Sequence, residues 1–169
     1  MKSSRFIICF VLMLAIQLVL ARYAQTPHMY ICMLPAMIMC LPMALPTWLC
    51  CVIAFACGMS VDFLADGMLG LNAAALLPVA LCNKYFVGTF INSDIVERNY
   101  SFSFWQNGLG KIGGTLLLHV LIYSVIYTLL DTLDSRDITF ILIKMLCSIL
   151  ASTVFGLVVI NILCPRPVR

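Results

Sequence analysis

The feature of this chain that most constrains its fold is a run of 39 residues, from Tyr23 to Val61, without one Asp, Glu, Lys or Arg. As a single α-helix this run would be about 58 Å long, at about 1.5 Å per residue. The hydrocarbon layer of a bilayer is only about 30 Å thick, and about 20 apolar residues cross it. The run therefore predicts two membrane crossings joined by a turn. We expect the turn at Pro42, Pro46 and Trp48, because proline ends helices and tryptophan prefers the membrane interface.

The composition points the same way. Of the 169 residues, 63% are hydrophobic and 10% are charged, whereas soluble domains carry about 25% charged residues. A soluble domain of this length could not bury so much apolar surface. The basic residues are scattered along the chain and form no stripe that would bind nucleic acid. We therefore expect an all-α integral membrane protein, a single transmembrane domain over residues 1–169 in contact with the lipid bilayer.

The apolar runs predict about six transmembrane helices in one bundle. Pro35 is expected to kink the second of them. Six crossings place both termini on one side, and seven of the ten Lys and Arg residues then fall on that side. The positive-inside rule makes that side the cytoplasm. The expected spans are residues 6–21, 29–45, 48–65, 72–90, 109–130 and 138–163.

Two aspartates interrupt the apolar sequence at the end of the third span, Asp62 and Asp66. A carboxylate costs about 2.5–3.5 kcal/mol at the centre of a helix in lipid, so such residues usually face protein. We expect Asp66 at the end of the span, followed by a turn made by Gly67 and Gly70. Asp62 lies one turn deeper, where it is expected to bond backbone, hydroxyl or cationic groups, or to contact a partner.

The pattern Gly58-xxx-Asp62-xxx-Asp66 also matches half of the motif that CDP-alcohol phosphotransferases use to hold a divalent metal. The other half of that motif is absent, because residues 40–57 contain no acidic residue. Two aspartates alone make a poor magnesium site. No serine lies in a Gly-x-Ser-x-Gly turn that would mark a nucleophile. We therefore expect no metal, no cofactor and no enzymatic activity.

The fifth span carries two features of its own. Gly110 and Gly114 have the four-residue spacing that lets membrane helices approach closely. The two readings are packing within the chain, which we favour, and contact with a partner helix. His119 lies near the middle of the span. A hydrogen-bonded core histidine is favoured there over a proton relay.

Residues 55–83 resemble the rod shape-determining protein MreD family of bacteria. That family has an apolar span ending in Gly-xxx-Asp followed by two apolar residues, then a small polar turn, Leu-Gly and a further apolar span. Pro27 before the second span also matches, whereas His28 stands where the family has Asn or Asp. The structural or partner-contact residues that this pattern marks are Gly58, Asp62, Gly67, Gly70 and Asn72.

The resemblance implies a non-enzymatic scaffold of the cell-elongation complex in the bacterial inner membrane, with both termini cytoplasmic. Such a subunit binds MreC and supports peptidoglycan synthesis and cell shape, together with RodA, a penicillin-binding transpeptidase and, indirectly, MreB. The family's fold is similar to the substrate-binding subunits of energy-coupling-factor transporters. The alternative is therefore a membrane subunit that binds a vitamin or a metal. Polar or aromatic residues converging under the outer loops would favour that alternative.

Overall fold

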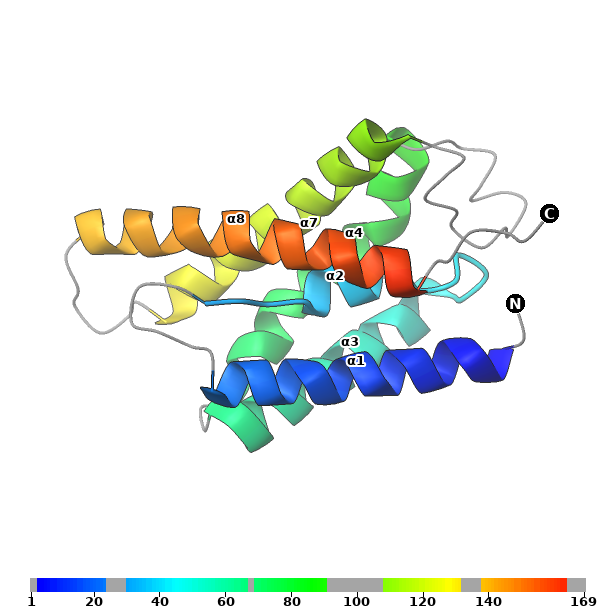
Figure 1. Ribbon diagram of the computed structural model, residues 1–169, viewed down its shortest axis with the longest axis horizontal. Helices are drawn as coiled ribbons and strands as arrows, with labels where there is room; N and C mark the ends of the chain where they lie inside the picture. Colours follow the sequence, from blue (N-terminus) through cyan, green and yellow to red (C-terminus); the bar gives the residue numbers. More distant parts are fainter. Residues whose placement is uncertain (1–2, 24–29, 67–68, 91–107, 132–137, 164–169) are drawn as a thin grey trace.

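The regular structure of this protein is helical throughout the part of the chain that the computed structural model describes, residues 3–23, 30–66, 69–90, 108–131 and 138–163. Figure 1 shows the helices gathered into one bundle. The helical segments in chain order are α1 (Ser3–Tyr23), α2 (Leu34–Met39), α3 (Thr47–Val61), the π-helical turn η1 (Asp62–Asp66), α4 (Leu71–Phe90), α7 (Leu109–Asp131) and α8 (Ile138–Leu163).

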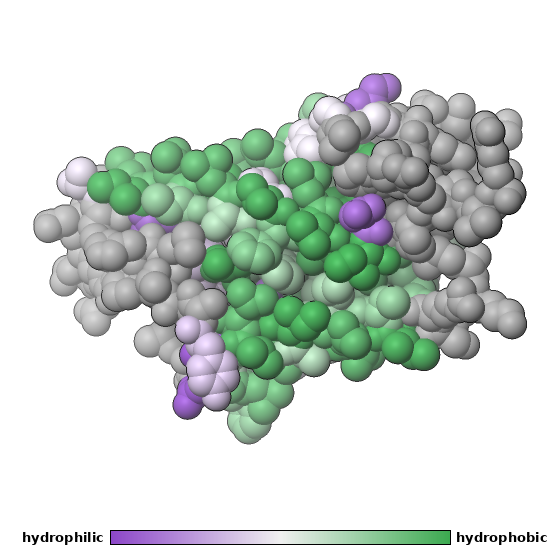
Figure 2. All heavy atoms as spheres, viewed as in Figure 1, coloured by the Kyte–Doolittle hydropathy of each residue, from purple (hydrophilic) through white to green (hydrophobic). Residues whose placement is uncertain are grey.

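Five of these elements are long and apolar enough to cross a membrane: α1, α3 with η1, α4, α7 and α8. The predicted all-α membrane bundle is thus confirmed. Large apolar side chains are exposed on the outside of α1 and α8, as expected for surfaces that face lipid. Figure 2 shows this apolar covering on the face that carries the two helices.

The second predicted span, residues 29–45, differs from the prediction because it is not one helix. Only Leu34–Met39 is helical, and residues 30–33 have no regular secondary structure. Pro35 lies in the first turn of α2 instead of kinking a longer helix. A proline ring clashes with the carbonyl four residues earlier, here that of Ile31, so the helix cannot extend further back. The ring of Pro42 clashes with Leu41, the residue before it, which disfavours a helical conformation there, and α2 ends at Met39.

The broken segment lies at the centre of the bundle. All six residues of α2 are buried, and α2 contacts α4, α7 and α8 as well as α1 and α3. In Figure 1 the segment runs from the end of the bundle where α1 finishes to the end where α3 begins. Five helices of the described chain could cross a membrane, and α2 lies among them. The start of α1 and the end of α8 lie at the same end.

Candidate functional site

The site is built around Asp62, where α3 passes into η1. The side chain of Asp62 is fully buried. Its Oδ2 accepts hydrogen bonds from the backbone N–H groups of Gly70 (3.0 Å) and Ala73 (3.2 Å). Its Oδ1 accepts from the backbone N–H of Asn72 (2.9 Å) and from the side-chain Nδ2 of Asn72 (2.8 Å). Three of these donors are backbone amides at the start of α4, so Asp62 caps this helix from another element.

This placement explains how a carboxylate is tolerated here. The first N–H groups of a helix have no partner within the helix, and together with the helix dipole they form a positive site. Both carboxylate oxygens of Asp62 are occupied by donors of the same chain. Within the described residues, the one ion pair is between Lys144 and Asp131, so the positive end of α4, not a cation, balances Asp62. The bonds to nearby backbone that we expected from the sequence are present.

The glycines around Asp62 allow α3 and α4 to meet backbone to backbone. A Cβ atom added to Gly58 would lie 2.5 Å from the Cα and 2.6 Å from the N of Ala73. Gly70 has a φ of +97°, which favours glycine. The sequence analysis therefore selected residues that the structure brings together at one hairpin: Gly58, Asp62, Gly70 and Asn72. Gly67 lies outside the described residues, as do Pro27 and His28, and Asp66 ends η1.

Asn72 connects this hairpin to the rest of the core. It is fully buried, and its Oδ1 accepts hydrogen bonds from the hydroxyls of Tyr30 (2.7 Å) and Tyr123. The ring of Tyr30 stacks on that of Tyr127, with centroids 4.4 Å apart. The tyrosines were missed in the sequence. The available signal was the spacing of Tyr123 and Tyr127, which places both on one face of a helix.

Residues 30–32, which precede α2 and have no regular secondary structure, lie against α8 along one edge. The backbone N–H of Tyr30 donates to Ser148 Oγ (2.9 Å), and that of Cys32 donates to Ser152 Oγ (3.0 Å). Two residues of a strand advance about 6.6 Å, and four residues of a helix advance about 6 Å, so the two spacings match. Two serine hydroxyls on one face of α8 thus accept the backbone hydrogen bonds that a neighbouring strand would accept in a sheet.

The opposite edge of the same segment lies against α1. Gln17, which is fully buried, accepts a hydrogen bond at Oε1 from the N–H of Met33 (2.8 Å) and donates from Nε2 to the carbonyl of Ile31 (3.3 Å). In lipid every backbone polar group must find a partner inside the protein. The amide side chain of Gln17 supplies one donor and one acceptor at once. The sequence analysis did not single out Gln17.

His119 is a hydrogen-bonded core residue, as predicted. It is fully buried. Its Nδ1 lies 2.7 Å from the carbonyl oxygen of Thr115, and its Nε2 lies 3.2 Å from Asn83 Oδ1. The Nδ2 of Asn83 donates to the carbonyl of Ile38 in α2 (3.1 Å). These bonds tie the broken segment to α4 and α7.

Gly110 and Gly114 do not pack against another helix of the described chain. A Cβ added at either position would meet nothing within 4 Å, and both residues are exposed. Packing within the chain, the reading favoured from the sequence, is not seen among the described residues, where the first turns of α7 present an open face of small residues.

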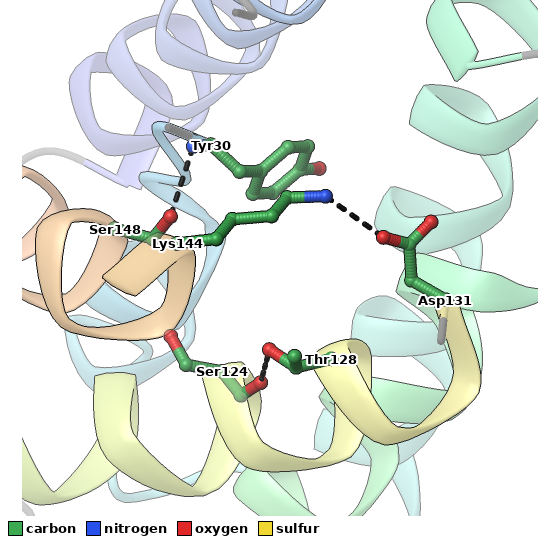
Figure 3. Close-up of polar contacts among 6 residues, drawn as sticks. All are labelled: Tyr30, Ser124, Thr128, Asp131, Lys144 and Ser148. Carbon is green, nitrogen blue, oxygen red and sulfur yellow. Dashed lines mark hydrogen bonds and ion pairs between the residues drawn. The ribbon is translucent and has the colours of Figure 1, made fainter. Parts of the chain in front are cut away.

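A second polar group lies where α7 ends and α8 begins. Lys144 Nζ forms an ion pair with Asp131 Oδ2 at 2.8 Å, with side chains 16% and 25% exposed. Figure 3 shows this pair beside Tyr30, with Ser124, Thr128 and Ser148 around it. The interface between α7 and α8 therefore collects charged, hydroxyl and aromatic groups in one place.

No three His, Cys, Asp or Glu side chains come close enough to hold a metal ion, as far as residues 3–23, 30–66, 69–90, 108–131 and 138–163 show. In comparisons with known proteins, no family model matches this chain, and neither a curated protein nor a solved structure does.

Proposed function

We propose that this protein is a non-enzymatic scaffold subunit of the bacterial cell-elongation complex, of the MreD type, in the inner membrane with both termini cytoplasmic. The observation that carries the proposal is the hairpin of α3 and α4. Four of the residues on which the resemblance rests, Gly58, Asp62, Gly70 and Asn72, form a single interlocked unit, in which Gly58 allows the close approach and Asp62 caps α4.

The chemistry of the hairpin supports a scaffold role. A catalytic carboxylate needs access to its substrate, but Asp62 is fully buried and all its hydrogen bonds hold the two helices together. The hairpin is joined to the core through Asn72 and the tyrosines. A rigid core would present the outer faces of the helices to MreC and to the RodA and transpeptidase complex in a fixed arrangement. The open face at Gly110 and Gly114 is the proposed contact for a partner helix.

The test replaces Asp62 by Asn and by Leu in a rod-shaped bacterium depleted of its own MreD. Co-purification with MreC and cell shape are measured. We expect Asp62→Leu to abolish both the complex and the rod shape, because four donors lose their acceptor. Asp131→Asn is the matched control, since this aspartate lies outside the hairpin. Normal MreC binding and rod shape in both Asp62 variants would refute the proposal.

The second candidate is a membrane subunit that binds a small molecule. Polar and aromatic residues converge between α7, α8 and the segment at Tyr30. Membrane transporters commonly place their sites beside interrupted helices, and the broken segment at residues 30–39 is such an interruption. This convergence of polar and aromatic residues supports the alternative.

A further inference from the structure

His119 holds both of its ring nitrogens against oxygen atoms. Nδ1 lies 2.7 Å from the backbone carbonyl oxygen of Thr115, and Nε2 lies 3.2 Å from the side-chain Oδ1 of Asn83. A carbonyl oxygen only accepts hydrogen bonds, whereas a neutral imidazole has a single N–H to donate. The neutral ring can therefore satisfy one of the two contacts. In the other contact a nitrogen lone pair faces an oxygen lone pair.

The amide of Asn83 cannot remove this conflict by turning over. Its Nδ2 donates to the backbone carbonyl of Ile38 at 3.1 Å. After turning over, the amide would donate to Nε2 of His119, but its Oδ1 would face the carbonyl oxygen of Ile38, which only accepts. The N–H of Leu41 also donates to this oxygen but places no hydrogen between the two oxygens. Each arrangement with a neutral ring therefore leaves one pair of acceptors in contact.

The short contact with Thr115 also fixes the orientation of the imidazole ring. If the ring turned over, a ring carbon would replace Nδ1 at 2.7 Å from the carbonyl oxygen. Carbon and oxygen atoms in C–H···O contacts are about 3.3–3.6 Å apart, so this position suits a nitrogen and not a carbon. Nδ1 therefore carries a hydrogen and donates to Thr115. The variable proton is the one on Nε2.

A proton on Nε2 completes a chain of hydrogen bonds across three helices. His119 then donates to Thr115 and to Asn83, and Asn83 donates to Ile38. Hydrogen bonds from a charged donor are roughly twice as strong as those from a neutral donor. The chain runs from α7 through α4 to α2, and each contact in it then pairs a donor with an acceptor.

The charge of the doubly protonated ring is not balanced by a carboxylate at this place in the described part of the chain. Asp131 lies about 18 Å further along α7, at about 1.5 Å per residue, and pairs with Lys144 of α8. Asp62 bonds the opposite end of α4, and α2 has no titratable side chain. Lys84 of α4, half-buried, and Lys111 of α7, exposed, are positive as well. The neutral ring thus loses a hydrogen bond, whereas the charged ring places a charge in the core.

We propose that His119 is a proton-binding site that controls how firmly α2 is tied to α4 and α7. With the proton bound, the chain of bonds from Thr115 to Ile38 is complete. When Nε2 releases its proton to water, during local opening of the helices, Asn83 loses one of its two bonds. The site needs no cavity, because its ligand is a proton. The inference is independent of the scaffold role and of the small-molecule candidate.

The test is nitrogen NMR of the full chain, labelled with ¹⁵N-histidine and held in lipid nanodiscs. The background variant His28→Gln leaves His119 as the one histidine. Between about pH 8 and pH 5, the range in which histidines titrate, we expect the folded protein to change from one N–H, on Nδ1, to two. A ring that keeps one N–H over this range would overturn the proposal. A neutral ring with its hydrogen on Nε2 would do the same.

Asn83→Leu removes the acceptor of the second proton. At the pH at which the wild type holds equal amounts of the two forms, this variant should hold roughly tenfold to a hundredfold less of the doubly protonated form, the loss expected for one hydrogen bond to a charged group. Asn83→Asp should retain that form, because a carboxylate also accepts from Nε2. Asn161→Leu, at an exposed position of α8, is the matched control. Equal ratios in Asn83→Leu and the wild type would overturn the proposal, and the wild-type spectrum tests it alone if the variant does not fold.

Cys40, directly after α2, reports the effect of the proton on this helix. The rate of maleimide labelling of Cys40 is divided by that of Cys57, a second buried cysteine, so that the pH dependence of the reagent cancels. We expect the ratio to rise severalfold as Nε2 loses its proton in the wild type, and to stay constant in Asn83→Leu. A constant ratio in the wild type would refute the control of α2. Co-purification with MreC tests the scaffold separately, since neither His119 nor Asn83 belongs to the residues of the hairpin motif.

Discussion

Gly58→Ala tests the close approach of α3 and α4. The added Cβ would lie 2.5 Å from Ala73 Cα and 2.9 Å from the backbone carbon of Asn72, whereas carbon atoms in contact prefer about 3.5 Å. The two helices must therefore separate by about 1 Å. Overpacking of this kind costs about 1–3 kcal/mol. The same movement stretches the hydrogen bonds to Asp62, and losing one bond to a charged group costs about 1.5–3 kcal/mol.

The expected total is a loss of about 2.5–6 kcal/mol of unfolding free energy. For a chain of this size that corresponds to a fall in Tm of about 5–24 °C. The assay is thermal unfolding in detergent, followed with a maleimide dye that fluoresces on reaction with cysteine. Cys50 and Cys57 are buried and react only on unfolding. Cys147 is exposed and gives the initial signal.

Gly114→Ala is the matched control, because a Cβ there would meet nothing within 4 Å. In a helix, alanine is favoured over glycine by up to about 1 kcal/mol, so the Tm should be unchanged or higher. An unchanged Tm for Gly58→Ala would show that the hairpin does not depend on the close approach. The assignment of Gly58 would then be wrong.

Three further substitutions test the polar contacts in the core. Asp62→Asn should lower the unfolding free energy by about 2–4 kcal/mol, because the amide NH₂ faces two N–H donors; a Tm equal to wild type would contradict the cap. Gln17→Leu leaves one buried N–H and one carbonyl unpaired, so we expect a loss of about 2–4 kcal/mol of unfolding free energy. Cys32, which is 1% exposed, should then react faster with the maleimide dye. Unchanged labelling would show that Gln17 does not hold residues 31–33 in place. Replacing Ser148 and Ser152 together by alanine should speed Cys32 labelling in the same way, whereas Thr153→Ala, on the same helix, should not, because Thr153 bonds only its own helix.

The sequence predicted the bundle well because membrane crossing depends on side-chain hydropathy, which can be summed along the chain. The spans predicted at residues 109–130 and 138–163 correspond closely to α7 and α8. The prediction of one helix over residues 29–45 was wrong because summed hydropathy does not show whether the backbone is helical. Residues 29–45 are apolar enough for a helix, and what keeps part of them extended lies on other helices, at Gln17, Ser148 and Ser152.

The candidate site was predicted in part for a similar reason. A lone carboxylate in apolar sequence marked Asp62, and neighbouring glycines marked the hairpin. Its partners Gly70, Asn72 and Ala73 lie only 8 to 11 residues further along the chain. A nearby backbone partner could therefore be expected. The hydroxyl of Tyr123 comes 51 residues after Asn72, and a pairing at that distance depends on how α4 packs on α7. No local pattern contains that information.

The irregular segment at residues 30–33 affects how the protein is made. The N–H of Tyr30 bonds Ser148, which follows 118 residues later, and that of Cys32 bonds Ser152, 120 residues later. At about 5–20 residues per second, the ribosome needs about 6–24 s to reach those serines. During that time the backbone polar groups on this edge lack their final partners, and lipid supplies none. Biosynthesis must therefore shelter the segment in water or in the insertion machinery until α8 enters the membrane.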